Sequence, residues 1–133
     1  MAFNEEDTLV ARKYTHLMAS ANSRGKEFGL NLSDVRKLLR RKTCAYTGVQ
    51  LTEPKPQPPN GTAKPEYTDR TIDRIDPSVG YHPHNVVTVC HLANSMKEQL
   101  LEGKLVDRAG KLSCDWSFLQ DFVKGLQKVG YRE

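Results

Sequence analysis

Apolar residues recur at three-to-four residue spacing in the first third of the chain, which predicts two amphipathic helices. The first is predicted over residues 5–23 with Asn4 as its cap, and the second over residues 34–42 with Ser33 as its cap. The apolar positions that define them are Leu9, Val10, Tyr14, Leu17, Met18 and Ala21, then Val35, Leu38 and Leu39.

Two β-branched runs, residues 71–76 and 85–89, flank a loop rich in turn-forming residues. A helix is predicted to open near Cys90 and to end before Gly103. A strand, a loop, a strand and a helix in so few residues cannot bury a core of their own. The pattern has the size of a ββα unit that holds one metal ion.

The other segments complete an α+β prediction. A tight turn at Thr47–Gly48 is expected within residues 44–51, a Pro-rich loop without regular structure over 52–70, and a hairpin or turn near residues 109–110. A last helix should begin at Ser113 or Asp115 and bury an apolar stripe (Trp116, Leu119, Phe122, Val123, Leu126). We predict one domain, 1–133. It has a basic helical lead-in (1–43), the ββα core (44–101) and a C-terminal helical segment (102–133), with the core packed against both sets of helices.

The stretch 71–97 resembles the HNH, or ββα-metal, endonucleases, and most closely small phage-type members whose first motif is Asp-Arg-Ile-Asp. The resemblance extends upstream to about residue 21. It is carried by Ala21, Arg24, Phe28, Leu30, Tyr46, Thr47, Gly48, Asp73, Arg74, Ile75, Asp76, Gly80, Tyr81, Asn85, Asn94 and Lys97. It implies a metal-dependent DNA endonuclease.

Asp73 and Asn94 match the two metal ligands of that family, and Glu98 lies one helical turn after Asn94. Carboxylate and amide oxygens suit a hard cation, so the expected cofactor is Mg²⁺ or Mn²⁺. The alternative is a strand-end acid paired with Arg74 and an Asn that caps a helix.

Arg74 stands where well-studied members of the family carry a general-base histidine. Arginine cannot accept a proton at neutral pH, so we expect it to clamp the phosphate, together with Lys97 on the helix. The base is then His82 or His84 in the loop, with His91 as a further candidate. Activation of water by the metal alone, or slow or lost cleavage, are the alternatives.

Asn85, Gly80 and Tyr81 match loop positions of the family. The resemblance implies a structural role, in which Asn85 ties the loop to the strand.

Positive charge is concentrated between residues 12 and 42, a segment that contains nine basic and two acidic residues, while the whole chain has a net charge of +4. Such a block suits phosphate binding, and the expected partner is double-stranded DNA. The alternative is a solvated helix face whose last arginines complement the helix dipole. The expected contacts are Arg24, Lys26, Arg36, Lys37, Arg40, Arg41 and Lys42.

The three cysteines form no Cys-x-x-Cys pair, and Thr47 and Ala93 stand where related zinc sites have cysteines. No structural zinc is therefore expected, and Cys44 and Cys90 should be reduced and buried.

No apolar run approaches the roughly 20 residues of a membrane helix, and the N-terminus lacks a secretory pattern. We expect no membrane partner and a cytoplasmic location, which for a phage protein is that of its host.

The missing base and the missing zinc ligands leave a second hypothesis open. The chain would then be a weak or inactive HNH-fold module that binds nucleic acid or a protein, whose identity the sequence does not give.

Overall fold

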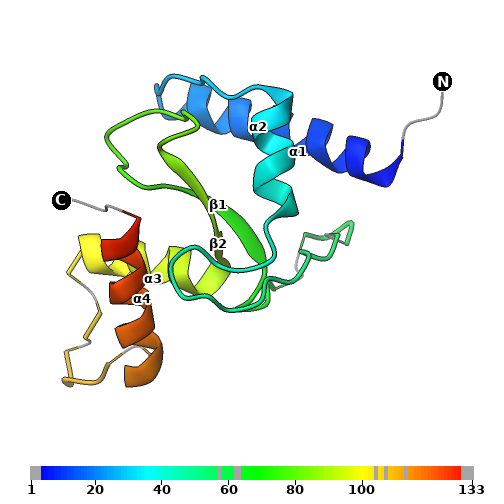
Figure 1. Cartoon of the computed structure of the whole chain (residues 1–133). Coiled ribbons are helices and arrows are strands. Elements are labelled where there is room, and N and C mark those ends of the chain that lie inside the picture. Colours follow the sequence, from blue (N-terminus) through cyan, green and yellow to red (C-terminus); the bar gives the residue numbers. More distant parts are fainter. Residues whose placement is uncertain are drawn as a thin grey trace.

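The computed structural model describes residues 4–56, 58–61, 64–103, 105–106, 108–112 and 114–129. Within them lie four helices and one two-stranded sheet (Figure 1). In chain order the elements are α1 (Glu5–Ser23), α2 (Leu32–Arg40), β1 (Arg70–Arg74), β2 (Val86–Cys90), α3 (His91–Leu101) and α4 (Trp116–Lys128). The predicted α+β class and the four-helix plan are confirmed.

Side chains at the helix starts set the boundaries. Asn4 Oδ1 accepts the backbone N–H of Asp7 at 2.8 Å, which confirms the predicted cap of α1. The predicted cap of α2 is wrong, because α2 begins one residue before Ser33. Asn31 and Asp34 form a capping box there, each side chain accepting the other's backbone N–H.

The sheet is a single antiparallel pair in which Asp73 lies opposite Val87 and Thr71 opposite Val89. The strand β2 is shifted by one residue from its predicted run, and β1 begins one residue earlier and ends two residues earlier than predicted. The helix α3 follows β2 directly, with Cys90 at its N-cap position. The sheet lies between α1 and α2 on one side and α3 and α4 on the other (Figure 1).

Two hydrophobic clusters hold these layers together. The first joins α1 and α2 to the hairpin through Val10, Leu17, Ala21, Leu30, Val35, Tyr81 and Val86. The second joins α3 and α4 to the 44–49 turn through Cys44, Tyr46, Val89, Cys90, Ala93, Met96, Phe122 and Leu126. The hairpin therefore has one core on each side.

The helix α4 approaches the 44–49 turn very closely. A Cβ atom on Gly125 would lie 1.6 Å from the carbonyl oxygen of Tyr46, so only glycine fits there. The ring of Phe122 packs edge-on against Tyr46 at 5.9 Å. The predicted core role of the α4 stripe holds for Phe122 and Leu126 but is wrong for Trp116 and Val123, which are 65% and 40% exposed.

The connecting segments are mostly irregular, as predicted. Gly48 has a φ of 76° in the turn between Thr43 and Gln50, which form an isolated bridge. A second bridge joins Thr52 to Asp69 at the base of the Pro-rich segment. Ser113, one of the two predicted starts of the last helix, lies outside the described residues, and the side chain of Asp115 caps α4. None of the described helices is long and apolar enough to cross a membrane.

Candidate active site

A polar cleft of about 450 Å³ runs along the β1 edge between the end of α1 and α3. Its walls bring together residues that are far apart in the sequence. They include Arg24, Asp73, Arg74, Tyr81, His91, Asn94, Lys97 and Glu98. The cleft therefore unites the two predicted metal ligands, the optional third ligand and the predicted phosphate clamp.

Asp73 is held by one of its two carboxylate oxygens. Its Oδ2 accepts hydrogen bonds from the Tyr46 hydroxyl and from Lys97 Nζ, both at 2.6 Å. No side chain or backbone group of the described residues donates to Oδ1. One oxygen is thus fixed by the protein, and the other remains available in the cleft.

Lys97 is buried, with only 2% of its side chain exposed, and it acts inside the protein. Besides Asp73, its ammonium donates to the carbonyl of Ile75 at 2.8 Å and to that of Arg74. Burial lowers the pKa of Lys97, and the Asp73 carboxylate opposes that shift. The predicted phosphate contact is therefore replaced in this geometry by a clamp on the end of β1.

Asn94 faces the same strand from α3. Its Nδ2 donates to Thr71 Oγ1 at 3.3 Å, which leaves the amide oxygen without a donor among the described residues. Glu98 follows on the cleft wall and is exposed. Among the described residues no three His, Cys, Asp or Glu side chains gather closely enough to hold a metal. One carboxylate and one amide oxygen fit Mg²⁺ or Mn²⁺, which retain several waters, better than an ion that needs a full protein cage.

Two arginines contribute positive charge to the cleft. Arg74 donates to the carbonyls of Pro77 at 2.7 Å and Val79 at 3.2 Å, and its guanidinium lies 5.1 Å from the centre of the Tyr81 ring. Arg24, from the end of α1, donates to the Tyr81 hydroxyl at 2.7 Å. Tyr81 thus connects two guanidinium groups on one wall.

The hairpin loop is tied together by Asn85, as the resemblance implies. Its Nδ2 donates to the carbonyl of Gly80 at 2.9 Å, and its Oδ1 accepts the backbone N–H of Asp76 at the same distance. A Cβ atom on Gly80 would lie 2.5 Å from the backbone oxygen of Glu27, so the loop can approach that segment only with glycine. These contacts set where Arg74 and Tyr81 sit.

The histidines separate into two places. His82 and His84 stack with ring centres 5.6 Å apart, and His82 Nε2 lies 3.2 Å from a Glu27 oxygen. Neither lines the cleft, whereas His91, at the first turn of α3, does. The loop histidines named first from sequence therefore lie outside the cleft in this geometry.

The basic block is divided by ion pairs. Arg36 and Arg40 bind the acids of α1, with Arg36 Nη2 2.6 Å from Asp7 and Arg40 Nη2 2.7 Å from Glu6. The hydrogen bonds from Arg40 and Arg36 lower the pKa of Glu6 to about 2. Two of the seven expected phosphate contacts are thus occupied by neighbouring carboxylates.

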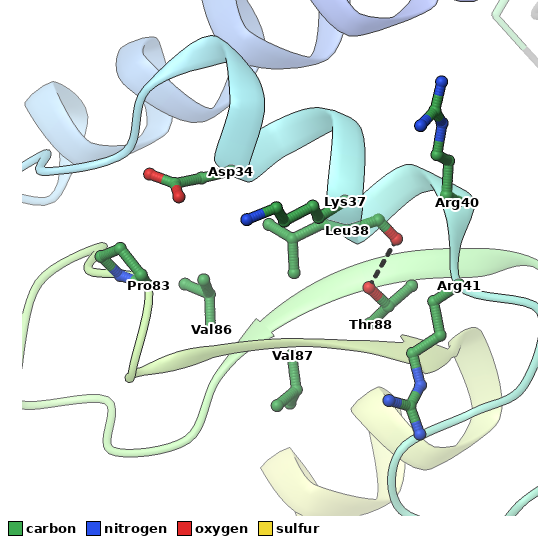
Figure 2. Close-up of a pocket in the computed structure, with 9 residues that line it drawn as sticks. All are labelled: Asp34, Lys37, Leu38, Arg40, Arg41, Pro83, Val86, Val87 and Thr88. Atoms are coloured by element: carbon green, nitrogen blue, oxygen red, sulfur yellow. Dashed lines mark hydrogen bonds between the residues drawn. The ribbon is translucent and has the colours of Figure 1, made fainter.

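The remaining members of the block point in several directions. Arg41 Nε donates to the backbone of Thr43, and Lys26 donates to that of Ser78. Lys42 is exposed on the segment after α2. Lys37 lies on a groove of about 570 Å³ between α2 and β2, whose floor includes Leu38 (Figure 2). In the same view Arg40 points away from that groove.

Cys44 and Cys90 are free and only 1% exposed. That they bind no structural zinc stays a prediction. The interaction between the two thiols lowers the pKa of Cys44 and raises that of Cys90. Thr47 Oγ1 lies 4.0 Å from the Cys90 sulfur.

Tyr46 and Thr71 are site residues whose roles are not predicted from the sequence. Tyr46 belongs to the resemblance, but a tyrosine in a turn carries no sign that its hydroxyl reaches a carboxylate 27 positions later. Thr71 is typical of strands in general, and only the alternation of Thr71 with Asp73 pointed to the α3 side.

No family model matches the chain. The chain is similar to an uncharacterized 29.0 kDa protein from the dda-modA intergenic region of Enterobacteria phage T4. The two are 27% identical over 105 residues, which is 79% of this chain and 38% of the phage protein. The chain therefore spans well under half of that relative's length.

The solved structure of the rare-cutting HNH restriction endonuclease PacI is similar to this chain, with a TM-score of 0.52 and 17% sequence identity. The likeness covers 82% of this chain and 87% of that one. With the antiparallel pair, the following α3 and the flanking helices described above, the chain has an α+β, HNH-like fold.

Proposed function

We propose that this protein is a divalent-metal-dependent endonuclease that hydrolyses phosphodiester bonds of double-stranded DNA in the cleft between β1 and α3. The observation that carries the proposal is the state of Asp73. One of its oxygens is held by Tyr46 and Lys97, and Asp73 lines the cleft together with Asn94, whose amide nitrogen is the atom that donates to Thr71. The HNH-like fold and the phage relative support it.

Asp73 and Asn94 would hold Mg²⁺ or Mn²⁺, with Glu98 as an optional third ligand. When bound, such an ion supplies Lewis acidity at the scissile phosphate. Arg24 and Arg74 orient and neutralise the phosphate from the opposite wall.

His91 is the best-placed side chain to accept a proton from the attacking water, because it is the histidine that lines the cleft. His82 and His84 would need the loop to move before they could serve. Alanine variants of the three histidines, compared at saturating metal, separate these choices. Loss at His91 alone supports this assignment, and loss only at His82 or His84 overturns it.

Plasmid cleavage with Mg²⁺ or Mn²⁺ tests the proposal. Asp73→Asn and Asn94→Ala should each reduce cleavage at least a hundredfold, and Mn²⁺ affinity should fall with it. Lys128→Gln on α4 is the matched control and should cleave as the wild type does. Cleavage equal in the wild type and Asp73→Asn rejects the assignment.

A second candidate is a DNA-binding module without cleavage. Arg74 favours it, because this side chain cannot accept a proton and two loop carbonyls engage it. Salt-sensitive DNA binding with no cleavage under any divalent ion would identify this case.

We also place the chain among the small phage-type members with an Asp-Arg-Ile-Asp first motif, here Asp73 to Asp76, acting in the cytoplasm of a host cell. The phage origin of the relative supports this placement.

A further inference from the structure

A second basic cavity lies at the other end of β1, away from the cleft. It has a volume of about 490 Å³ and is formed where α1 and the start of the Pro-rich segment meet Arg70. Four basic residues and one acidic residue are among those that line it. These residues are Arg12, Lys13, Lys55, Arg70 and Glu53.

The charge of this cavity is only partly neutralised from within. Glu53 pairs with Arg70 at 2.7 Å, which uses the single carboxylate. The side chains of Arg12 and Lys13 form no hydrogen bond or ion pair with another described residue, although Lys13 is half-buried. Burial first, and then repulsion by Arg70, lowers the pKa of Lys13. An anion that bound here would counter the repulsion by Arg70 and stabilise the charged form of Lys13.

Two elements, α1 and β1, contribute residues to both the cavity and the cleft. The helix α1 carries Lys13 here and Arg24 in the cleft, and eleven residues of helix span about 16 Å. The strand β1 carries Arg70 here and Arg74 in the cleft, and four residues of strand span about 13 Å. The backbone N–H of Arg70 donates to Thr52 at 2.9 Å, so the Pro-rich segment joins β1 at this end.

We infer that this cavity binds a backbone phosphate of the same DNA that occupies the cleft, with Arg12 and Lys13 as its principal contacts. The inference rests on the proposed function for its ligand. A separation of about 13–16 Å corresponds to four or five phosphates of one strand along a duplex axis at about 3.4 Å each. Apolar side chains around the cavity, such as Leu9 and Pro54, suit the sugar between phosphates.

The test is duplex affinity measured by fluorescence anisotropy in EDTA, where no cleavage occurs. The double variant Arg12→Gln/Lys13→Gln should bind a duplex of roughly 20 base pairs about tenfold more weakly. Its slope of log affinity against log salt should be smaller by about 2, near 0.9 per lost contact. The single variant Arg12→Gln, at an exposed position, should show about half the change in slope and guards against misfolding by Lys13→Gln.

The matched control is Lys124→Gln/Lys128→Gln, which removes the same charge from α4. It should leave affinity and slope close to those of the wild type. A duplex too short to reach from the cleft to Arg12 should bind the wild type and the double variant equally.

Equal losses in the double variant and the α4 control overturn the inference, as does a wild type without salt-dependent duplex binding. Metal-dependent plasmid cleavage, measured on the same preparations, reports the proposed function separately. A protein that never cleaves but loses affinity in Arg12→Gln/Lys13→Gln would contradict the nuclease proposal and support this site.

Discussion

Two ion-pair networks of this protein, one in the cleft and one between α1 and α2, differ in how far they are buried. In the cleft, Lys97 is buried and Asp73 is half-buried, and their further partners include the Tyr46 hydroxyl and the carbonyl of Ile75. Between α1 and α2, Arg36 and Arg40 pair with Glu6 and Asp7 near the surface. Water screens the second network, so it holds two helices loosely, whereas the first fixes the geometry of a single carboxylate.

The largest effect should come from breaking the buried network. Lys97→Met leaves the Asp73 carboxylate without its cationic partner and the carbonyls at the end of β1 without this donor, at a cost of about 3–5 kcal/mol in the free energy of unfolding. Chemical denaturation measures this cost. Lys37→Met, at an exposed position of α2, should change it by less than about 0.5 kcal/mol.

The double variant Lys97→Met/Asp73→Asn tests whether the ion pair itself causes that loss of stability. It should recover much of the lost stability, because the unpaired Asp73 carboxylate is gone, but no cleavage should return. A double variant as unstable as Lys97→Met alone would show that the carbonyl contacts, and not the ion pair, dominate.

A smaller loss of stability is expected when the Tyr46 hydroxyl, the second donor to Asp73, is removed. Tyr46→Phe keeps the ring against Phe122 and removes one hydrogen bond to Asp73, for about 1–2 kcal/mol of stability. Mn²⁺ titration should show weaker metal binding, since Asp73 gains freedom to rotate. Unchanged metal affinity would argue against an orienting role for Tyr46.

Freeing the surface arginines should have the opposite sign for DNA. Glu6→Gln/Asp7→Asn releases Arg36 and Arg40, so duplex affinity at low salt should rise several-fold, with a steeper salt dependence. Anisotropy measures both quantities. Glu5→Gln, which removes an acid in the same first turn, is the control, and an equal rise there would mean that net charge alone is responsible.

The smallest effect is the acid response of the surface network. Folding lowers the pKa of Glu6 from its ordinary 4.5 to about 2. Its contribution to stability is therefore fully present above pH 4.5 and is lost as the pH falls through about 2. The difference in melting temperature between the wild type and Glu6→Gln should shrink over that window, and a difference that stays constant with pH would contradict it.

The sequence predicts the local parts of this site because they depend on short-range patterns. The strand–loop–strand–helix order follows from runs of β-branched residues and from turn residues, and Asn85 follows from the resemblance. The cap of α2 was misplaced by two residues, since Ser33 and Asn31 are both good caps. Only the position of Asp34 three residues after Asn31 distinguishes them.

The long-range parts were harder to predict for a physical reason. A lysine on a helix reads as exposed, and the burial of Lys97 depends on where carbonyls at the end of β1 are placed by the fold. The basic block was counted along the chain, but acids at positions 6 and 7 neutralise part of it from another helix. The number of basic residues in a segment is therefore a poor guide to how many of them remain unpaired in the fold and can bind a ligand.

The contact between Gly125 and the Tyr46 carbonyl has a consequence for engineering. Tyr46 donates to Asp73, and α4 packs against Tyr46, so the last helix supports the position of the Asp73 carboxylate. A minimal cassette cut from residues 44–101 would keep every cleft residue of the hairpin and α3 yet lose that support. Transplanting this chemistry into another scaffold therefore requires a replacement for α4, or a tyrosine braced by the new host.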